Sequence, residues 1–263
     1  MKKVDCTRDI FKSSLLKQVI IRADYSYITD LNRFITELKS WSKDFFSGYR
    51  IIRTNSIDLR IDSIAISNKQ IPVDIKETEN IHRFYDSQII PKQDTTIDIS
   101  SNFICITIDC DENYGKIDPY LDYISEVMEK LKSYDSYVQF NRLAIRKIDG
   151  SDFDNLDKAY EIFEKINGFE DSIIENVKKV KQSYTDIFIS ENANLKINLT
   201  RSIEHFPSGN VRYVLDTDGY IDSVTDLSKK DDYLSLFNNI NNELFRIFKI
   251  NVTETFLNNG TYE

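Results

Sequence analysis

The feature that most constrains this chain is the placement of arginine in segments that alternate apolar and polar residues. Such alternation predicts β-strands, because successive side chains point to opposite faces of a sheet. Arginine is the side chain best suited to hold a planar anion in a partly dry place. We therefore expect a sheet with a positive face. Eight of the twelve arginines lie in such segments: Arg22, Arg50, Arg53, Arg60, Arg142, Arg146, Arg201 and Arg212.

The length and net charge of the chain limit the number of domains it can form and the partners it can bind. At 263 residues the chain is at the length where one core stops growing and two sub-domains form. A net charge of −9 disfavours non-specific binding to nucleic acid or to an anionic membrane. Only 7 glycines occur, which argues against a Gly-rich nucleotide-binding scaffold.

The first half predicts strands and helices in the order β-α-β-β-β-α-β. A strand near residues 18–24 precedes an amphipathic helix that runs from Ile28 to Phe45, with Gly48 placed to end it. Strand patterns follow at 49–66 and 102–109, and residues 67–100 hold shorter pieces. Asp118 and Pro119 predict a helix start, and residues 137–148 return as a strand.

The second half predicts mainly strands and one long helix. The polar stretch 149–154 marks the boundary, and a short helix from Leu156 closes at Gly168. Residues 169–182 fit a helix or a strand, and strands follow at 184–189, 195–203 and 211–215. Apolar residues at helical spacing from Leu234 to Phe248 predict the C-terminal helix. We expect an α+β fold, with antiparallel sheets, helices packed on one face, and two similar halves at 1–150 and 151–263.

Three cysteines and the absence of a secretory signal or a membrane-length apolar run predict a cytoplasmic protein with reduced thiols. Only two histidines occur, His82 and His205, far apart in sequence, which disfavours a zinc site and a Ser-His nucleophile. The acidic run 109–115 resembles a calcium loop at its first, third and fifth positions, but Tyr114 and Tyr120 stand where such a loop has Gly and Glu. We expect no cofactor.

The segment from Asp216 through Asp218 to Gly219 resembles the nucleophile loop of haloacid-dehalogenase-type phosphatases. That chemistry sits near the start of a parallel sheet, whereas this segment follows an antiparallel hairpin near the chain end. The favoured interpretation is a strand end followed by a turn, where Asp and Gly are common.

Arg142 and Arg146 share one face of their strand and lie about 13 Å apart at ~3.3 Å per residue. One interpretation pairs them with sheet aspartates, for which Asp109, Asp216 and Asp218 are available. The other is a site for a small anion or an acidic peptide, with Asp216 and Asp218 holding a metal.

The layout resembles a sporadically distributed family of bacterial proteins of unknown function. The opening segment 15–24 is similar to the family's first strand, and 140–149 to its central Arg-x-Gly-x-Arg segment, with Ala144 in place of the Gly. Residues 215–218 match its late Leu-Asp-x-Asp motif, and 236–256 its closing helix. The resemblance brings no known reaction or cofactor. Its sporadic distribution implies genes on mobile elements and a role in phage defence or a toxin–partner system.

Two functions remain open at this point. The leading hypothesis is a non-enzymatic interaction or sensor protein with a protein partner, as an accessory component of such a system. An exposed apolar patch rimmed by charge would support it. The alternative is a metal-dependent enzyme or binding protein for a phosphorylated small molecule. It requires Arg142, Arg146, Asp216 and Asp218 to converge in one pocket.

Overall fold

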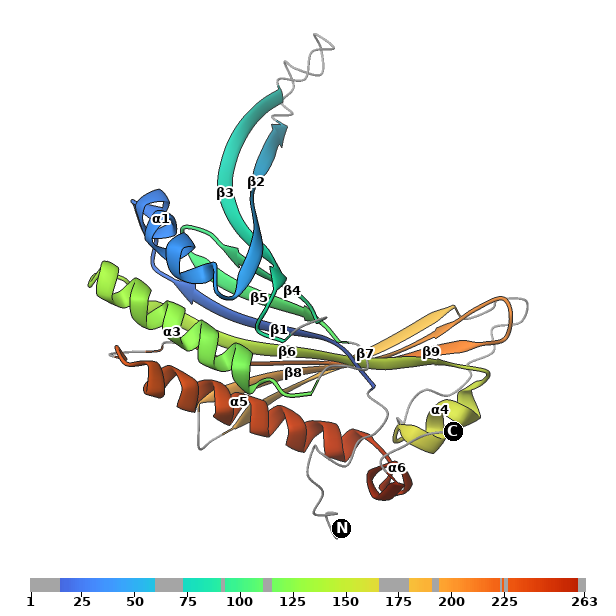
Figure 1. The fold of residues 1–263 in the computed structure, drawn as a ribbon. Helices are drawn as coiled ribbons and strands as arrows, with labels where there is room; N and C mark the ends of the chain where they lie inside the picture. The colour runs from blue at the N-terminus through green and yellow to red at the C-terminus, as the bar shows by residue number, and fades with distance from the viewer. Residues whose placement is uncertain are drawn as a thin grey trace.

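A computed structural model describes residues 15–59, 73–90, 93–110, 115–165, 180–190, 194–222, 224 and 227–259. Its centre is one antiparallel sheet of nine strands in the order β2-β3-β4-β5-β1-β6-β9-β8-β7 (Figure 1). The strands are β1 (Leu16–Tyr25), β2 (Phe46–Leu59), β3 (Val73–Ser87), β4 (Asp94–Ile99), β5 (Phe103–Asp109), β6 (Phe140–Phe153), β7 (Lys181–Ser190), β8 (Leu195–His205) and β9 (Val211–Asp222). The predicted α+β fold with an antiparallel sheet is confirmed.

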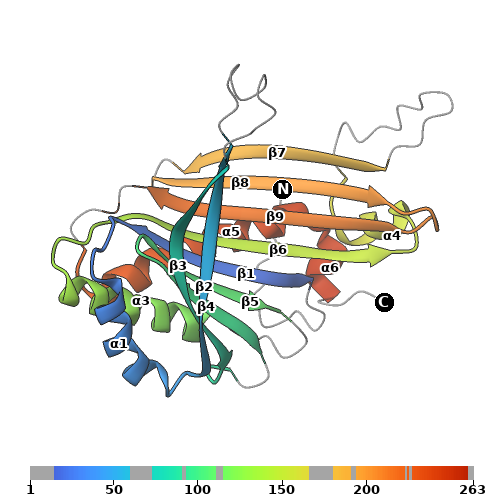
Figure 2. The ribbon, with the colours of Figure 1, turned by 90° about the horizontal axis from the view of Figure 1, so that it is seen from above.

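The helices lie together against one face of this sheet (Figures 1 and 2). They are α1 (Leu31–Ser42), α3 (Asp118–Tyr134), α4 (Leu156–Ile162), α5 (Lys230–Asn251) and α6 (Glu254–Asn259). The long helices α3 and α5 contact each other, and α5 also contacts β6 and β9. We call the opposite side, which no described helix covers, the helix-free face.

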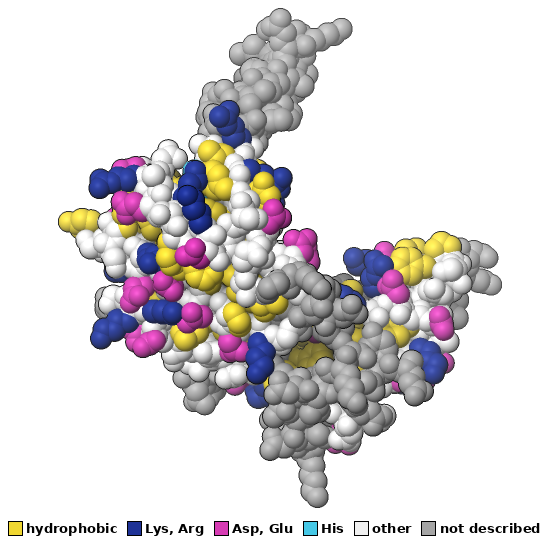
Figure 3. All heavy atoms as spheres, in the orientation of Figure 1, with side chains coloured by type: hydrophobic (Ala, Val, Ile, Leu, Met, Phe, Trp, Pro, Cys, Tyr) yellow, Lys and Arg dark blue, Asp and Glu magenta, His cyan; other side chains and the backbone are white. Residues whose placement is uncertain are grey.

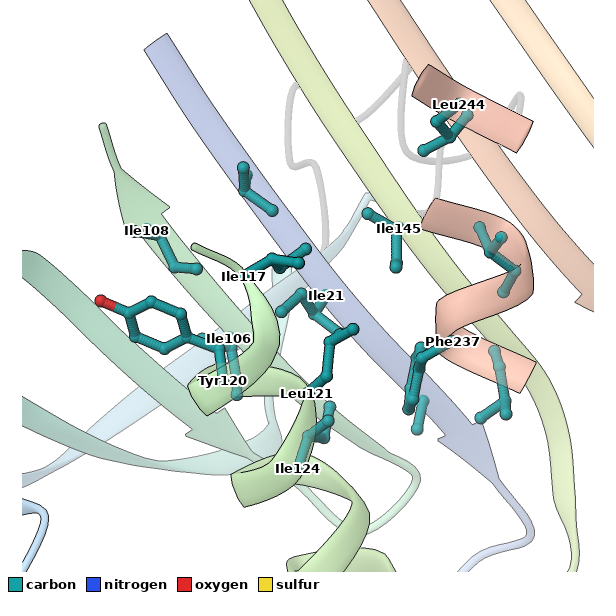
Figure 4. Close-up of a cluster of buried hydrophobic side chains, with 14 of the residues drawn as sticks. Ile21, Ile106, Ile108, Ile117, Tyr120, Leu121, Ile124, Ile145, Phe237 and Leu244 are labelled. Atoms are coloured by element: carbon teal, nitrogen blue, oxygen red, sulfur yellow. The ribbon is translucent and has the colours of Figure 1, made fainter. Parts of the chain in front are cut away.

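The core forms because strand and helix periodicities present apolar side chains to the same layer. In β1 the residues Val19, Ile21 and Ala23 are fully buried, while their neighbours are not. Leu121 and Ile124 of α3 meet them from the helix layer (Figure 4). Burying each large side chain contributes about 1.5–3 kcal/mol, so this layer supplies most of the stability.

Helix α1 is shorter than its sequence pattern predicts. Asp30 caps its start by accepting a hydrogen bond from the Arg33 amide, and the helix ends at Ser42. Gly48 therefore does not end the helix, and the prediction is wrong on this point. Gly48 lies inside β2, where the Tyr85 ring of β3 occupies the space that a Cβ would need.

A bulge in β6 changes one predicted face. Asp24 pairs with Arg142, but the next residue, Tyr25, pairs with Phe140, so Asn141 is an extra residue. Phe140 is thereby turned into the core, where its ring contacts Tyr25 and Tyr233. Strict alternation would have placed Phe140 beside Arg142, which lies on the helix-free face.

Two other boundaries differ from the sequence pattern. Strand β9 does not end at Leu215 but continues to Asp222, so Asp216, Asp218 and Gly219 lie within a strand rather than in a turn. Residue 150 falls inside β6, which pairs with both β1 and β9. The division into halves at 1–150 and 151–263 stays a prediction. No described helix is both long and apolar enough to cross a membrane.

Candidate functional site: the helix-free face and the outer edge strand

The register of the central strands gathers the four predicted site residues in one cluster on the helix-free face. Arg142 and Arg146 come from β6, and Asp216 and Asp218 come from β9, with Arg146 directly opposite Asp218. Arg146 binds Asp216 through two hydrogen bonds, Nε to Oδ1 at 2.8 Å and Nη2 to Oδ2 at 2.6 Å. The four side chains therefore lie close together on a face of the sheet, whereas the alternative function required them to converge in one pocket.

Arg142 lies between two carboxylates and an aromatic ring. Its Nη2 donates to Asp218 Oδ2 at 3.1 Å, and its Nη1 lies 3.8 Å from Asp24 Oδ2. The guanidinium carbon stands 4.3 Å from the centre of the Tyr220 ring, a distance typical of a cation–π contact. The interpretation that pairs these arginines with sheet aspartates is confirmed for Asp216 and Asp218.

The same pairing extends across the sheet, so the predicted positive face is wrong. Further pairs on this face join Arg22 to Asp24, Arg83 to Asp98, Lys196 to Asp222, and Arg212 to Asp152. Positive and negative side chains alternate because neighbouring antiparallel strands place them within reach of each other. Arg60 lies outside the described residues, and Arg201 instead lies on the helix side, paired with Asp186.

The pKa values follow from this pairing and from burial. Burial raises the pKa of Asp218, and the nearby Arg142 and Arg146 only partly oppose that rise. The hydrogen bond to Asp216 raises the pKa of Arg146. At the exposed end of β6, the hydrogen bond from Arg212 lowers the pKa of Asp152. The cluster is thus an internally compensated set of charges rather than a field of one sign.

A metal at Asp216 and Asp218 would have to displace guanidinium groups. Both carboxylates already accept hydrogen bonds from arginine. Within the described ranges no group of three or more His, Cys, Asp or Glu side chains is arranged to hold a metal ion. The loop resembling a calcium site has its positions 111–114 outside those ranges.

The outer edge of the sheet differs in character from this charged centre. Strand β7 pairs with β8 along its whole length without a register shift, and no described strand pairs with its other edge. Two isoleucines point to the helix-free face, Ile187 with 69 % and Ile189 with 67 % of its surface exposed. On the helix side Phe188 is 41 % exposed. Among the described residues, five of the nine exposed large apolar side chains lie between positions 180 and 189.

The charged centre and the apolar edge form one continuous surface. Cross-strand pairing aligns Arg146 of β6, Asp218 of β9, Asn198 of β8 and Ile187 of β7 in one row. In Figure 3 hydrophobic side chains are exposed at the end of the sheet formed by β7 and β8, with charged side chains beside them. In Figure 3 the surface is hollowed between this end and the arm that β2 and β3 form, which Figure 1 labels.

The sequence pattern predicts a strand at 184–189 but does not indicate that this strand is a binding site. A sequence signal for such a site does exist. Ile187, Phe188 and Ile189 are consecutive, so a strand at this position has apolar side chains on both faces. A strand of that kind is either buried on both faces or left open for a partner. Only the strand order distinguishes these cases.

Comparison with known proteins assigns this chain to no family. No family model matches the chain, and no curated protein matches it. A solved structure of the S. pombe Pct1 RNA triphosphatase aligns with 90 % of this chain and 82 % of its own, at 9 % sequence identity and a TM-score of 0.14. A similarity at that level supports no conclusion about fold or function.

Proposed function

We propose that this chain is a non-enzymatic interaction protein that binds another protein by accepting a strand at β7. The observation that carries the proposal is the clustering of exposed apolar side chains on a strand whose outer edge pairs with no described strand. Strand addition uses the unpaired N–H and C=O groups for affinity and the alternating side chains for specificity.

The composition of β7 supports this function because the strand lacks the devices that block edge pairing. Soluble proteins protect sheet edges with proline, bulges, or inward-pointing and repeated charges. β7 has no proline, pairs with β8 without a bulge, and carries one lysine, at its first position, Lys181. Its one acidic residue, Asp186, is already paired with Arg201. Such an edge is a pairing site unless a partner covers it.

The cellular setting is proposed from the sequence resemblance. A cytoplasmic chain from a sporadically distributed bacterial family fits an accessory component of a phage-defence or toxin–partner system. A component of that kind recognises a protein and needs no reaction of its own.

Quantitative capture with a matched pair of variants tests the proposal. Tagged protein would be purified from its host as the unaltered chain, as Ile187→Lys and as Ile250→Lys. Ile250 is an exposed isoleucine on α5, so its variant makes the same chemical change away from β7. We expect a stoichiometric protein, including any untagged copy of the chain, to be lost with Ile187→Lys and retained with Ile250→Lys. Equal capture by all three forms contradicts the proposal.

The alternative, a metal-dependent enzyme or a binding protein for a phosphorylated small molecule, is favoured by one observation. Arg142, Arg146, Asp216 and Asp218 do lie together on an open surface. Their mutual pairing weighs against it, because an anion would compete with carboxylates already in place. A ligand titration, described in the Discussion, distinguishes the two functions.

A further inference from the structure

We infer that the strand added at β7 belongs to a second copy of this chain, so that two sheets join through an antiparallel β7–β7 pair. This inference rests on the proposed function and names its partner. A two-fold axis perpendicular to the sheet brings β7 against itself in antiparallel orientation and keeps the helix layers of both copies on the same side. Closed two-fold assemblies are the commonest form of oligomer.

The charge of strand β7 is compatible with pairing to β7 of a second copy of the chain. Between Lys181 and Ser190 there is one positive and one negative side chain, although the whole chain carries −9. Asp186 is neutralised within its own chain by Arg201. A strongly charged edge would repel a second copy, whereas this edge presents a nearly neutral surface.

The positions of the apolar residues select one register. A two-fold axis at Phe188 places Phe188 opposite its own copy and Ile187 opposite the partner's Ile189, so three apolar residues meet the same three. An axis at Asp186 would instead place two carboxylates opposite each other. Aromatic and β-branched cross-strand pairs are among the favourable ones, and like charges directly opposite are unfavourable.

No described strand lies beyond β7 at this margin of the sheet. Helix α5 packs against β6 and β9, and Figure 2 shows β7 at the outer margin of the sheet beyond β8. Phe188 on the helix side and Ile187 on the other face are both exposed, at 41 % and 69 %. The copy therefore covers apolar residues of both faces at once, which a ligand on one face would not do.

The first test is the mass of the purified chain in solution across a concentration series. We expect the unaltered protein and Ile250→Lys to approach twice 30.8 kDa. We expect Ile187→Lys to remain at 30.8 kDa, with an unchanged circular dichroism spectrum as the check on folding. A dimer that persists in Ile187→Lys overturns the inference, because it would use another surface.

Disulfide trapping then tests the register. In an antiparallel pair, directly opposite Cα atoms lie about 4.5–5.5 Å apart, within the range of a disulfide. Phe188→Cys should cross-link to its own copy under mild oxidation. Tyr184→Cys, on the same strand and face, should not, since eight residues of offset separate the two copies by about 26 Å at ~3.3 Å per residue. The unaltered chain controls for its native cysteines, and cross-linking at 184 instead of 188 refutes the register.

The outcomes separate this inference from the proposed function. A chain that stays monomeric at every concentration, yet loses a different captured protein on Ile187→Lys, refutes the second copy and supports strand addition by another partner. A monomer whose capture is insensitive to Ile187→Lys refutes both. A dimer disrupted by Ile187→Lys supports both.

Discussion

At the residue scale, Asp149 is a buried acid among the charged residues of β6. Its pairing with Leu215 places it on the helix side of the sheet, and it is the only carboxylic acid among the buried residues described. Burial raises its pKa to about 7, Lys147 opposes the rise, and Asp216 adds to it. Lys147 itself donates to Asn241 of α5 at 2.6 Å, so a small polar group lies within the apolar layer.

This burial makes stability depend on pH in a defined direction. The folded pKa of Asp149 lies above its ordinary value of 3.8, so between about pH 4 and 7 the folded state holds a proton that the unfolded state releases. The free energy of unfolding should therefore fall as pH rises through that window, by at most about 4 kcal/mol from this residue. Urea unfolding of the unaltered protein and of Asp149→Asn would measure it.

Subtracting the two pH profiles isolates Asp149 from His82. Burial lowers the pKa of His82, which gives the opposite slope in both proteins and therefore cancels. We expect Asp149→Asn to lack the fall toward neutral pH. Parallel profiles for the two proteins would show that Asp149 is ionised in the folded state.

The two site arginines should differ in their effect on stability. Arg146 keeps 46 % of its side-chain surface exposed, so Arg146→Ala should cost less than about 1 kcal/mol despite its two hydrogen bonds. Arg142 is less exposed, at 30 % of its side-chain surface, and Arg142→Ala removes the hydrogen bond to Asp218, so it should cost about 1–3 kcal/mol. Denaturant unfolding of both variants measures this, and the reverse order would show that Arg146 is the structural residue.

At the level of the elements, the packing of helix α5 against strand β9 depends on a glycine within that strand. An added Cβ at Gly219 would lie 2.9 Å from Leu244 Cδ2 and 3.1 Å from Ile240 Cγ2, both in α5. Both side chains are fully or almost fully buried, which limits their freedom to move. Gly219 thus sets how closely the helix approaches the sheet.

We expect Gly219→Ala to destabilise the protein by about 1–3 kcal/mol through overpacking. Gly115→Ala is the matched control, because no atom lies within 4 Å of its added Cβ, and it should change stability by no more than about 0.5 kcal/mol. In the Gly219→Ala background, Leu244→Ala should cost less than it does alone, since it removes the clash. Strictly additive costs would mean that the helix does not rest on this glycine.

At the scale of the whole molecule, net charge and charge pairing together determine what the helix-free face can bind. The chain carries −9, and its site arginines are already engaged by carboxylates. A phosphorylated ligand would have to overcome both the overall repulsion and the loss of existing pairs.

We therefore expect pyrophosphate with Mg²⁺ to leave the melting temperature of the protein unchanged at constant ionic strength. A ligand that binds only the folded state raises stability by mass action, so thermal denaturation detects it without knowledge of any reaction. A rise that disappears in Arg146→Ala would instead favour the anion-binding alternative. Arg33→Ala, at an exposed arginine of α1, is the control for charge alone.

Local periodicity explains how much of the fold could be predicted from the sequence. The stripe of Leu121, Ile124 and Met128 identifies α3, and the alternation in β1 and β5 identifies strands, because each pattern is complete within one segment. The predictions of secondary structure were wrong where a neighbouring strand, distant in sequence, determines the conformation of a residue. Gly48 fits a helix end in isolation, but the pairing of β2 with β3 places it in a strand opposite Tyr85, whose ring occupies the space of a Cβ.

Local sequence patterns were enough to predict the α+β class, the faces of the long helices, and the presence of arginines in strands. Three features became known only from the three-dimensional arrangement: β1 lies between β5 and β6, Arg146 binds Asp216, and β7 is an edge strand among the described strands. Strand order and register depend on residues far apart in the chain, here 70 positions for Arg146 and Asp216. No local pattern encodes such a pairing, because it results from the joint packing of all the strands on one core.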